Sequence, residues 1–315
     1  GEYVYMRMYE HVAKMPLGGT DTLLMIPAAD AAYFCVWENQ FVYMSSADRC
    51  IYSADLDTVD EELDTVETVC LSQYPVQEGD LPILHKGYLS YITDTGEDVS
   101  EVIQINLGTG QVVASSRGEY ILSLCFYGDF MYFVTYDSDA VISTIYRAGR
   151  NGENLAEMGS LSGLVVSQGA YADGFYYSWY DGTQSGLSWI AEPGSEAVNY
   201  YRETGGKVIG GTMRRDGGSY IYFLYMNADL SAMEKGLYRV AIEPGATAEL
   251  INAECNDTVI SPDDSTYLFF IAGEEGNQIV RFQEDGTGAT IWRTAEQPIL
   301  QLSVAEPYLY MMTED

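Results

Sequence analysis

The sequence is poor in the groups on which enzyme chemistry most often depends. It contains two histidines, His11 and His85, and five dispersed cysteines. Neither histidine lies in an HExxH, HxE or HxH pattern, and no two cysteines form a CxxC pair, so we expect no zinc site and no histidine-dependent triad. GxSxG, GxGxxG and phosphate-loop motifs are also missing, which removes the usual support for acyl transfer and nucleotide binding.

Basic side chains are scarce as well. The 315 residues include 15 Lys and Arg against 47 Asp and Glu, which gives a net charge of −32. The basic residues form no stripe, so we expect neither nucleic acid nor an anionic membrane surface as a partner. No stretch approaches the roughly 18 apolar residues of a membrane span, so we expect no membrane insertion.

The beginning of the chain carries no leader. Gly1 stands directly before the first strand-like segment, so we expect that the natural N-terminus has been removed. A low lysine content, the acidic excess and 27 tyrosines are typical of an exported bacterial protein. We therefore expect an extracellular or surface-anchored location.

A phrase of alternating aromatic and aliphatic residues recurs eight times along the chain. Its first aromatic residues are Tyr3, Phe41, Tyr88, Phe130, Phe175, Tyr220, Tyr267 and Tyr308, with steps of 38, 47, 42, 45, 45, 47 and 41 residues. Both faces of each phrase are apolar, so each strand must be covered on both sides. A period of about 44 residues built from such strands predicts an all-β fold, the β-propeller.

A second phrase and a turn follow most copies of the first. Examples are 145–147 before Asn151-Gly152 and 279–281 before Asp285-Gly286. They predict a third strand that turns into a fourth, and therefore four-stranded blades. The strands that line the axis are expected at 31–36, 80–84, 120–126, 163–169, 207–213, 255–260 and 298–304.

The number of phrases favours seven blades in one domain over residues 1–315. In this interpretation the C-terminal strands pair with the N-terminal blade and close the ring, and eight blades are the alternative. The fifth position of the phrase is expected to be buried between blades at Tyr5, Tyr43, Tyr132, Tyr222, Phe269 and Tyr310.

Tyr91-Ile92-Thr93-Asp94 resembles the Tyr-Trp-Thr-Asp signature of propellers of the low-density-lipoprotein-receptor type, and 132–135 is a looser copy. The chain as a whole resembles an uncharacterised family of secreted or lipid-anchored propellers from Gram-positive bacteria. The resemblance implies a fold and an export route. Most blades lack the Trp and Asp of the signature, so receptor-like ligand binding is not carried over.

The clearest candidate for a ligand site is the aromatic segment 175–181 together with the next hairpin strand. Trp179, Tyr180 and Trp189 lie beyond the core of the phrase, and beside Asp181 they could form a platform on which a sugar ring stacks. Phe175 and Tyr177 occupy core positions of the phrase, so burial in the blade is the competing interpretation.

Acidic segments are the candidates for cation binding. The run 55–64 holds six acids but lacks the glycine and the spacing of a calcium loop, so a solvated loop is the simpler interpretation. The pairs Asp137 with Asp139 and Asp263 with Asp264 could act at blade tips, although turns favour Asp for local reasons. We expect no cofactor and no transition metal, with calcium as the cation that these oxygens would suit.

The leading interpretation is a monomeric, non-enzymatic propeller that binds a protein or a glycan through one face. The alternative is a carbohydrate-active or calcium-dependent hydrolase or lyase that uses carboxylates at the axial mouth. The alternative needs three or more acids from different blades at one end of the axis. The axis-lining segments carry few, such as Glu38, Asp80 and Asp257.

Overall fold

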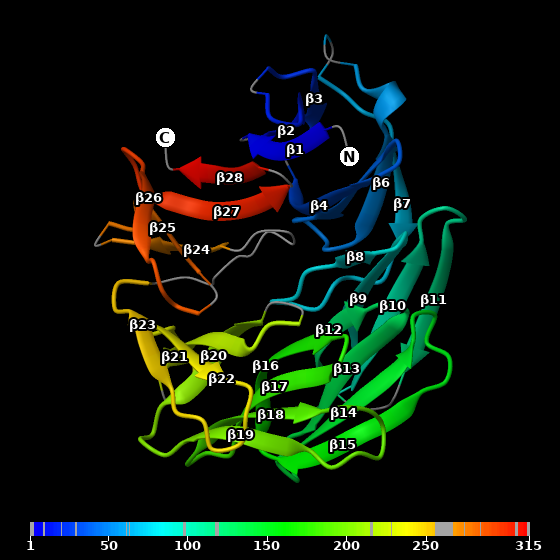
Figure 1. Cartoon of the computed structure of the whole chain (residues 1–315). Coiled ribbons are helices and arrows are strands. Elements are labelled where there is room, and N and C mark those ends of the chain that lie inside the picture. Colours follow the sequence, from blue (N-terminus) through cyan, green and yellow to red (C-terminus); the bar gives the residue numbers. More distant parts are fainter. Residues whose placement is uncertain are drawn as a thin grey trace. The chain divides into compact units, whose positions relative to one another are not determined.

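The structure is a computed structural model of the chain. It describes residues 3–8, 10–19, 21–28, 30–60, 62, 64–96, 99–116, 120–214, 217–227, 229–255, 267–273, 275–283, 285–305 and 308–313. The fold is an all-β, seven-bladed propeller with antiparallel blades of four strands, two of them with three. Figure 1 shows the strands along the chain.

The first three blades come from the N-terminal part of the chain. The first has three strands, and the other two have four. Their strands are β1 (Tyr3–Met8), β2 (His11–Pro16) and β3 (Leu24–Pro27); β4 (Ala31–Trp37), β5 (Gln40–Ser45), β6 (Ile51–Asp55) and β7 (Thr68–Ser72); and β8 (Ile83–His85), β9 (Tyr88–Gly96), β10 (Val99–Asn106) and β11 (Gln111–Ser116).

The following three blades have four strands each. Their strands are β12 (Tyr120–Tyr127), β13 (Phe130–Asp137), β14 (Ile142–Gly149) and β15 (Ala156–Ser162); β16 (Leu164–Tyr171), β17 (Gly174–Tyr180), β18 (Ser185–Ile190) and β19 (Val198–Glu203); and β20 (Val208–Arg214), β21 (Tyr220–Met226), β22 (Leu237–Ala241) and β23 (Glu249–Asn252).

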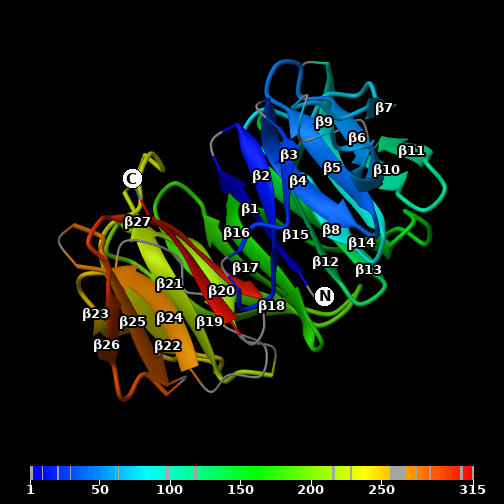
Figure 2. The ribbon, with the colours of Figure 1, turned by 90° about the horizontal axis from the view of Figure 1, so that it is seen from above.

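The C-terminal part forms two smaller sheets. The seventh blade has the order β24-β25-β26, and β27 pairs with β28 in a two-stranded sheet. The bounds are β24 (Tyr267–Ala272), β25 (Gln278–Gln283), β26 (Thr290–Thr294), β27 (Ile299–Ala305) and β28 (Tyr308–Thr313). Figure 2 shows β24, β25 and β26 side by side in the turned view.

Contacts between residues divide the chain into two compact units. The first comprises 1–124 with 150–153, and the second comprises 125–149 with 154–315. The predicted pairing of the C-terminal strands with the N-terminal blade, and with it a single closed domain, stays a prediction. The three-residue helix η1 (Leu56–Thr58) is the one helix in the described part of the chain, so no helix there has the length of a membrane span.

All eight phrases predicted as strands are strands in the structure, namely β1, β5, β9, β13, β17, β21, β24 and β28. The predicted third strands are confirmed too, because 145–147 lies in β14 and 279–281 in β25. Of the expected axis-lining strands, 80–84 begins too early, since β8 starts at Ile83. The segment 255–260 lies outside the described residues except for Cys255.

The core lies between neighbouring sheets, as strands with two apolar faces require. In the first unit Val42 and Met44 of β5 pack in one cluster with Leu89 and Tyr91 of β9. Of the six residues expected at equivalent buried positions, Tyr43, Tyr132, Tyr222 and Phe269 are buried. Tyr5 is only half-buried and packs against the cluster that contains Phe41 and Tyr43. The side chain of Tyr310 lies outside the described residues.

Candidate functional site

The structure separates the four residues that the sequence suggested as a ligand platform. Trp179 and Tyr180 end β17, and Asp181 begins the turn that follows it, whereas Trp189 lies near the end of β18. Because β18 runs antiparallel to β17, Tyr180 pairs with Ser185 at one end of the hairpin and Tyr176 pairs with Trp189 toward the other. Trp179 pairs with Gly186, so Trp179 and Trp189 also point to opposite faces of the blade.

Trp179 was expected to be exposed, but only 8% of it is. Its ring covers Gly186, where an added Cβ would lie 2.5 Å from the indole. Its Nε1 donates to Ser188 Oγ at 3.0 Å. Trp179 is therefore held inside the blade because the residue opposite it has no side chain.

Tyr180 and Asp181 make local contacts. The hydroxyl of Tyr180 donates to the carbonyl of Gly182 at 3.0 Å. Asp181 Oδ1 accepts from the backbone N–H groups of Thr183 and Gln184, each at 2.8 Å. The N–H of Gln184, followed by the hydroxyl and N–H of Thr183, lowers the pKa of Asp181. This pattern is that of an Asp that stabilises its own turn, and a role of these two residues in ligand contact stays a prediction.

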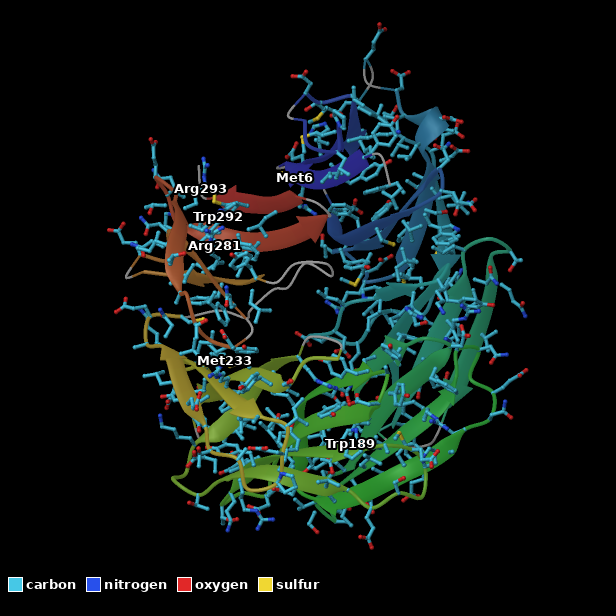
Figure 3. All side chains as sticks on the ribbon, viewed as in Figure 1. Met6, Trp189, Met233, Arg281, Trp292 and Arg293 are labelled. Carbon is cyan, nitrogen blue, oxygen red and sulfur yellow. The ribbon has the colours of Figure 1, made fainter. Side chains whose placement is uncertain are left out.

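Trp189 belongs to a different site, which includes the turn between β16 and β17. Its Nε1 donates to the carbonyl of Asp173 at 2.9 Å. Gly174 permits this contact, because it adopts a φ of +138° and a Cβ there would lie 2.5 Å from Trp189 Nε1. The ring centroids of Trp189 and Tyr176 are 6.1 Å apart. Figure 3 labels Trp189 among the side chains of its blade.

Beside this turn the second unit has an open pocket of about 450 Å³. Its walls come from the β16–β17 turn, the β20–β21 turn and the end of β22. The lining residues are Asp173, Tyr176, Arg214, Gly218, Ser219, Tyr220, Ala241, Ile242 and Glu243. Two neighbouring blades of the second unit therefore build one pocket from their turns.

Arg214 is the centre of the pocket's polar network. Nη1 donates to Asp173 Oδ1 at 2.8 Å and Nη2 donates to Asp173 Oδ2 at 3.2 Å, so the two side chains form a bidentate salt bridge. Nε and Nη2 both donate to the carbonyl of Gly218, at 3.3 and 3.1 Å. The guanidinium carbon lies 4.4 Å from the ring centroid of Tyr176 and 5.1 Å from that of Tyr171. These contacts fix the guanidinium in one position.

Asp173 is the partly exposed member of the pair. Its side chain is 49% exposed, whereas that of Arg214 is 5% exposed. The Tyr176 hydroxyl donates to Asp173 Oδ2 at 2.9 Å. Burial alone would raise the pKa of Asp173, but the hydrogen bonds from Arg214 and Tyr176 and the charge of Arg214 outweigh burial, so the pKa is lowered. Asp173 therefore stays ionised and can accept hydrogen bonds from a ligand.

Tyr200, in the outer strand β19, packs against Tyr176 of this network. It is buried, and its ring meets that of Tyr176 edge to face with centroids 6.2 Å apart. Burial raises the pKa of Tyr200 well above its usual value, so the phenol is neutral. Its hydroxyl makes no hydrogen bond within the part of the chain that the structure describes.

The chemistry of this pocket suits binding better than catalysis. A general acid or base needs a pKa near the working pH, whereas the pKa of Asp173 is lowered and that of Tyr176 is raised, chiefly by burial. What the pocket offers is a fixed carboxylate, a second carboxylate on exposed Glu243, and tyrosine hydroxyls.

The acidic segments proposed for calcium are engaged in their own turns. Asp55 Oδ1 caps η1 by accepting from the N–H of Asp57 at 2.9 Å. Asp137 Oδ1 accepts from the N–H of Asp139 at 2.9 Å. Asp263 and Asp264 lie outside the described residues. Among the residues that are described, no three His, Cys, Asp or Glu side chains form a metal-binding group.

Sequence reasoning missed Asp173, Tyr176 and Arg214. Two signals were available. Arg214-Arg215 is a pair of adjacent basic residues in a strongly acidic chain, and Asp173-Gly174 is a turn in front of the most aromatic strand. Neither signal shows that these segments meet, because that depends on how neighbouring blades pack.

No protein-family model and no curated protein matches the sequence. Solved structures do resemble it. Apo AztD from Citrobacter koseri has a TM-score of 0.61 and 11% identity over 98% of this chain and 87% of its own. Puromycin hydrolase has a TM-score of 0.61 and 11% identity over 99% of this chain, but only 56% of its own. Kluyveromyces lactis Hsv2 has a TM-score of 0.56 and 9% identity over 100% of this chain and 94% of its own. At such identities the likeness shows the propeller fold alone.

Proposed function

We propose that the protein is a non-enzymatic binding propeller whose pocket beside Arg214 takes a glycan. The observation that carries the proposal is the fixed Arg214–Asp173 pair, with contacts of 2.8 and 3.2 Å, at the wall of an open polar pocket. Sugar hydroxyls donate well to carboxylates that cannot move, because the cost of ordering the protein group has been met during folding.

The charge of the pocket selects a class of ligand. Asp173 and Glu243 together outnumber Arg214, whose donors are directed at Asp173 and Gly218. A neutral, hydroxyl-rich ligand suits this arrangement, whereas a phosphorylated or carboxylated sugar would face two carboxylates. A protein ligand at the same face is the competing outcome of the test.

The same proposal includes export and anchoring at the surface of a bacterial cell, together with kinship to propellers of the low-density-lipoprotein-receptor type. The acidic composition supports export, and the Tyr91–Asp94 motif, which lies within β9, supports the kinship. Fractionation of cells that express the natural gene, followed by detection of the protein in cytosol, membrane and medium, tests the location.

The test of ligand binding is a panel of neutral and acidic glycans measured by thermal shift and then by calorimetry. A glycan at about 100 times its dissociation constant should stabilise the protein by about 2.7 kcal/mol. Glu243→Gln should weaken binding of the best neutral glycan about tenfold or more, since it removes a hydrogen bond to a charged group. Glu275→Gln, the same change at an exposed turn outside the pocket, is the control.

Two results would remove the proposal. One is a panel in which no glycan raises the melting temperature. The other is equal binding by Glu243→Gln, Glu275→Gln and the unmodified protein, because the glycan would then bind outside this pocket.

One observation in the first unit concerns the enzymatic alternative, although it involves two acids and not three from different blades. Burial, followed by the charge of Asp94, raises the pKa of Asp80 to about 6, against a smaller lowering effect of Arg49. Asp94 lies in β9 and Asp80 just before β8, so both belong to one blade. Hydrolysis of a glycan by the unmodified protein that Asp80→Asn abolishes would establish this alternative.

A further inference from the structure

The outer strand of the seventh blade is unusually exposed. All five side chains of β26 are exposed, including 59% of Ile291 and 46% of Trp292. By contrast, the outer strands β15 and β19 contain the buried residues Met158 and Tyr200. Within the described residues β26 is the last strand of its sheet, so its outer edge presents backbone groups that can pair with another strand.

Trp292 is exposed and yet held in place. The register of β25 with β26 shifts so that Ile279 pairs with Arg293 and Val280 with Ile291, which leaves Trp292 as the extra residue of a bulge. The bulge directs Trp292 onto Phe269, with ring centroids 5.5 Å apart at 68°. A rigid, half-exposed indole loses little conformational freedom when a partner covers it.

Two arginines lie on the same face as Trp292. Arg293 pairs with Ile279, and Arg281 lies two residues further along β25, which places both guanidinium stems on one face. Arg281 pairs with Phe269, the residue on which Trp292 packs. Figure 3 shows Arg281, Trp292 and Arg293 near one another at the edge of this blade.

The charges of these arginines are not neutralised inside the described part of the chain. Arg281 lies 4.9 Å from the ring centroid of Tyr267. By contrast, Arg214 and Arg239 each reach a carboxylate at 2.8 Å. No such ion pair involves Arg281 or Arg293 among the described residues, although the chain holds 47 acids. The edge is therefore a local positive patch on an acidic protein.

We propose that β26 is a docking edge for an extended segment of a partner protein that alternates acidic and apolar residues. The segment adds to the sheet as a strand beside β26, with main-chain hydrogen bonds along the edge. Its acidic side chains meet Arg293 beside Trp292, and Arg281, which lies one strand further in on β25, adds to the positive charge of this face. Its apolar side chains meet Ile291, which the bulge places on the other face together with Val280.

A second copy of the chain does not suit this edge. Arginine is the one charged residue type in β26, so pairing of two copies would bring guanidinium groups together. An acidic segment is attracted locally, because salt screens the remaining charge of the protein beyond about 8 Å at physiological ionic strength.

The experiment measures fluorescence anisotropy with short labelled peptides. The probe is a peptide in which glutamate and valine alternate. It is used in two forms, one that begins with glutamate and one that begins with valine. One matched peptide carries lysine in place of glutamate, and a second is the probe methylated at alternate backbone nitrogens. We expect the probe to bind, the lysine peptide not to bind, and the methylated peptide to bind at least tenfold more weakly because it cannot complete the strand ladder.

Variants assign the binding to β26. Arg281→Gln with Arg293→Gln, and separately Trp292→Ala, should each weaken binding at least tenfold. The matched control is Arg202→Gln, which removes an exposed arginine of the outer strand β19 whose guanidinium lies 5.5 Å from the ring of Trp179. Circular dichroism and the melting temperature show that each variant is folded.

Four results would overturn the proposal. These are no binding of the probe at concentrations up to about 1 mM, equal loss of binding in Arg202→Gln, binding of the methylated peptide as tight as that of the probe, and a dimer in sedimentation that Trp292→Ala dissociates. The test is independent of the glycan pocket, because the variants lie in another blade.

Discussion

The pair formed by Arg214 and Asp173 gives the sharpest test of the candidate site. The two substitutions are Arg214→Met, which keeps an apolar stem, and Asp173→Asn, which keeps the shape of the acid and removes its charge. The quantity to measure is the free energy of unfolding at neutral pH, from urea denaturation followed by circular dichroism. Equal m-values would show that the unfolded state is comparable in each protein.

Arg214→Met removes four hydrogen bonds and a cation above two rings. Asp173 is 49% exposed, so water can solvate the carboxylate that remains, and loss of the ion pair costs about 1 kcal/mol. The Gly218 carbonyl loses both of its donors, which costs about 1 kcal/mol, and the contacts with Tyr171 and Tyr176 together add about 1 kcal/mol. The expected total is about 3 kcal/mol.

Asp173→Asn changes fewer atoms but should cost as much or more. Arg214 stays charged in this variant, because the ordinary pKa of a guanidinium lies far above neutral. Its side chain is 5% exposed, so the charge would be left without a counter-charge or adequate solvation. Removal of one partner from a buried pair costs about 3 to 5 kcal/mol. The double variant should cost less than the sum, since the two groups interact directly.

The control is Glu249→Gln, which breaks the more exposed pair with Arg239 and should cost about 0 to 1 kcal/mol. A cost of Asp173→Asn no greater than that of the control would refute the reasoning, because Arg214 would then be solvated in the folded state. Additive costs in the double variant would refute it as well.

Three further predictions concern pH, the core and the C-terminus. The pKa of Asp80 is raised to about 6 in the folded protein, so its ionisation destabilises the fold as pH rises from about 4 to 6. Asp80→Asn should therefore stabilise the protein at pH 7 by about 1 kcal/mol, after allowance for partial exposure. Urea titrations at acidic pH should show the same stability for the variant and the unmodified protein. Ionisation of Asp173 has the opposite effect and stabilises the fold, because the pKa of Asp173 is lowered in the folded protein. This stabilisation is complete above the unfolded pKa of about 3.9 and is lost as pH falls through the folded value. The stability of Asp173→Asn should therefore fall less at acidic pH than that of the unmodified protein. Phe269→Ala should cost about 3 to 5 kcal/mol because the ring is buried between sheets, and a cost near zero would contradict the blade register. Deletion of 298–315 should lower the melting temperature of the whole protein, because it removes Ile299 and Leu302 and uncovers Phe269, Ile271 and Ile279, against which they pack. An unchanged melting temperature would contradict the ring-closure model.

The blades could be predicted from the sequence because each depends on local alternation. Strands such as β17 are apolar on both faces over six or more residues, and glycines mark the turns. The period then fixes the class of fold. The pairing of the terminal strands is harder to predict, because the partner of a terminal strand is distant in sequence and the alternation of residues does not identify it.

The ligand platform could not be placed from the sequence, because nearness along a hairpin does not mean nearness in space. Trp189 follows Trp179 by ten residues, and yet the two face opposite sides of the blade. The exposure of Trp179 was also misjudged, since a glycine in the opposite strand makes room for a ring. Such a pairing is visible only when the register of the hairpin is known.

The pocket itself follows a rule that the repeat supplies. Neighbouring blades place residues about one period apart into contact, so Asp173 meets Arg214 across 41 residues, and Ser167 meets Thr212 across 45 at 2.7 Å. The backbone N–H of Arg214 donates to the Tyr171 hydroxyl across 43. Opposite charges at about this spacing, near the start of the repeated phrase, are therefore candidates for a contact between blades, as Asp173 and Arg214 are. Sites that lie between blades in repeat proteins of this kind should therefore be sought one repeat apart and at the same end of the strands, rather than among neighbours in sequence.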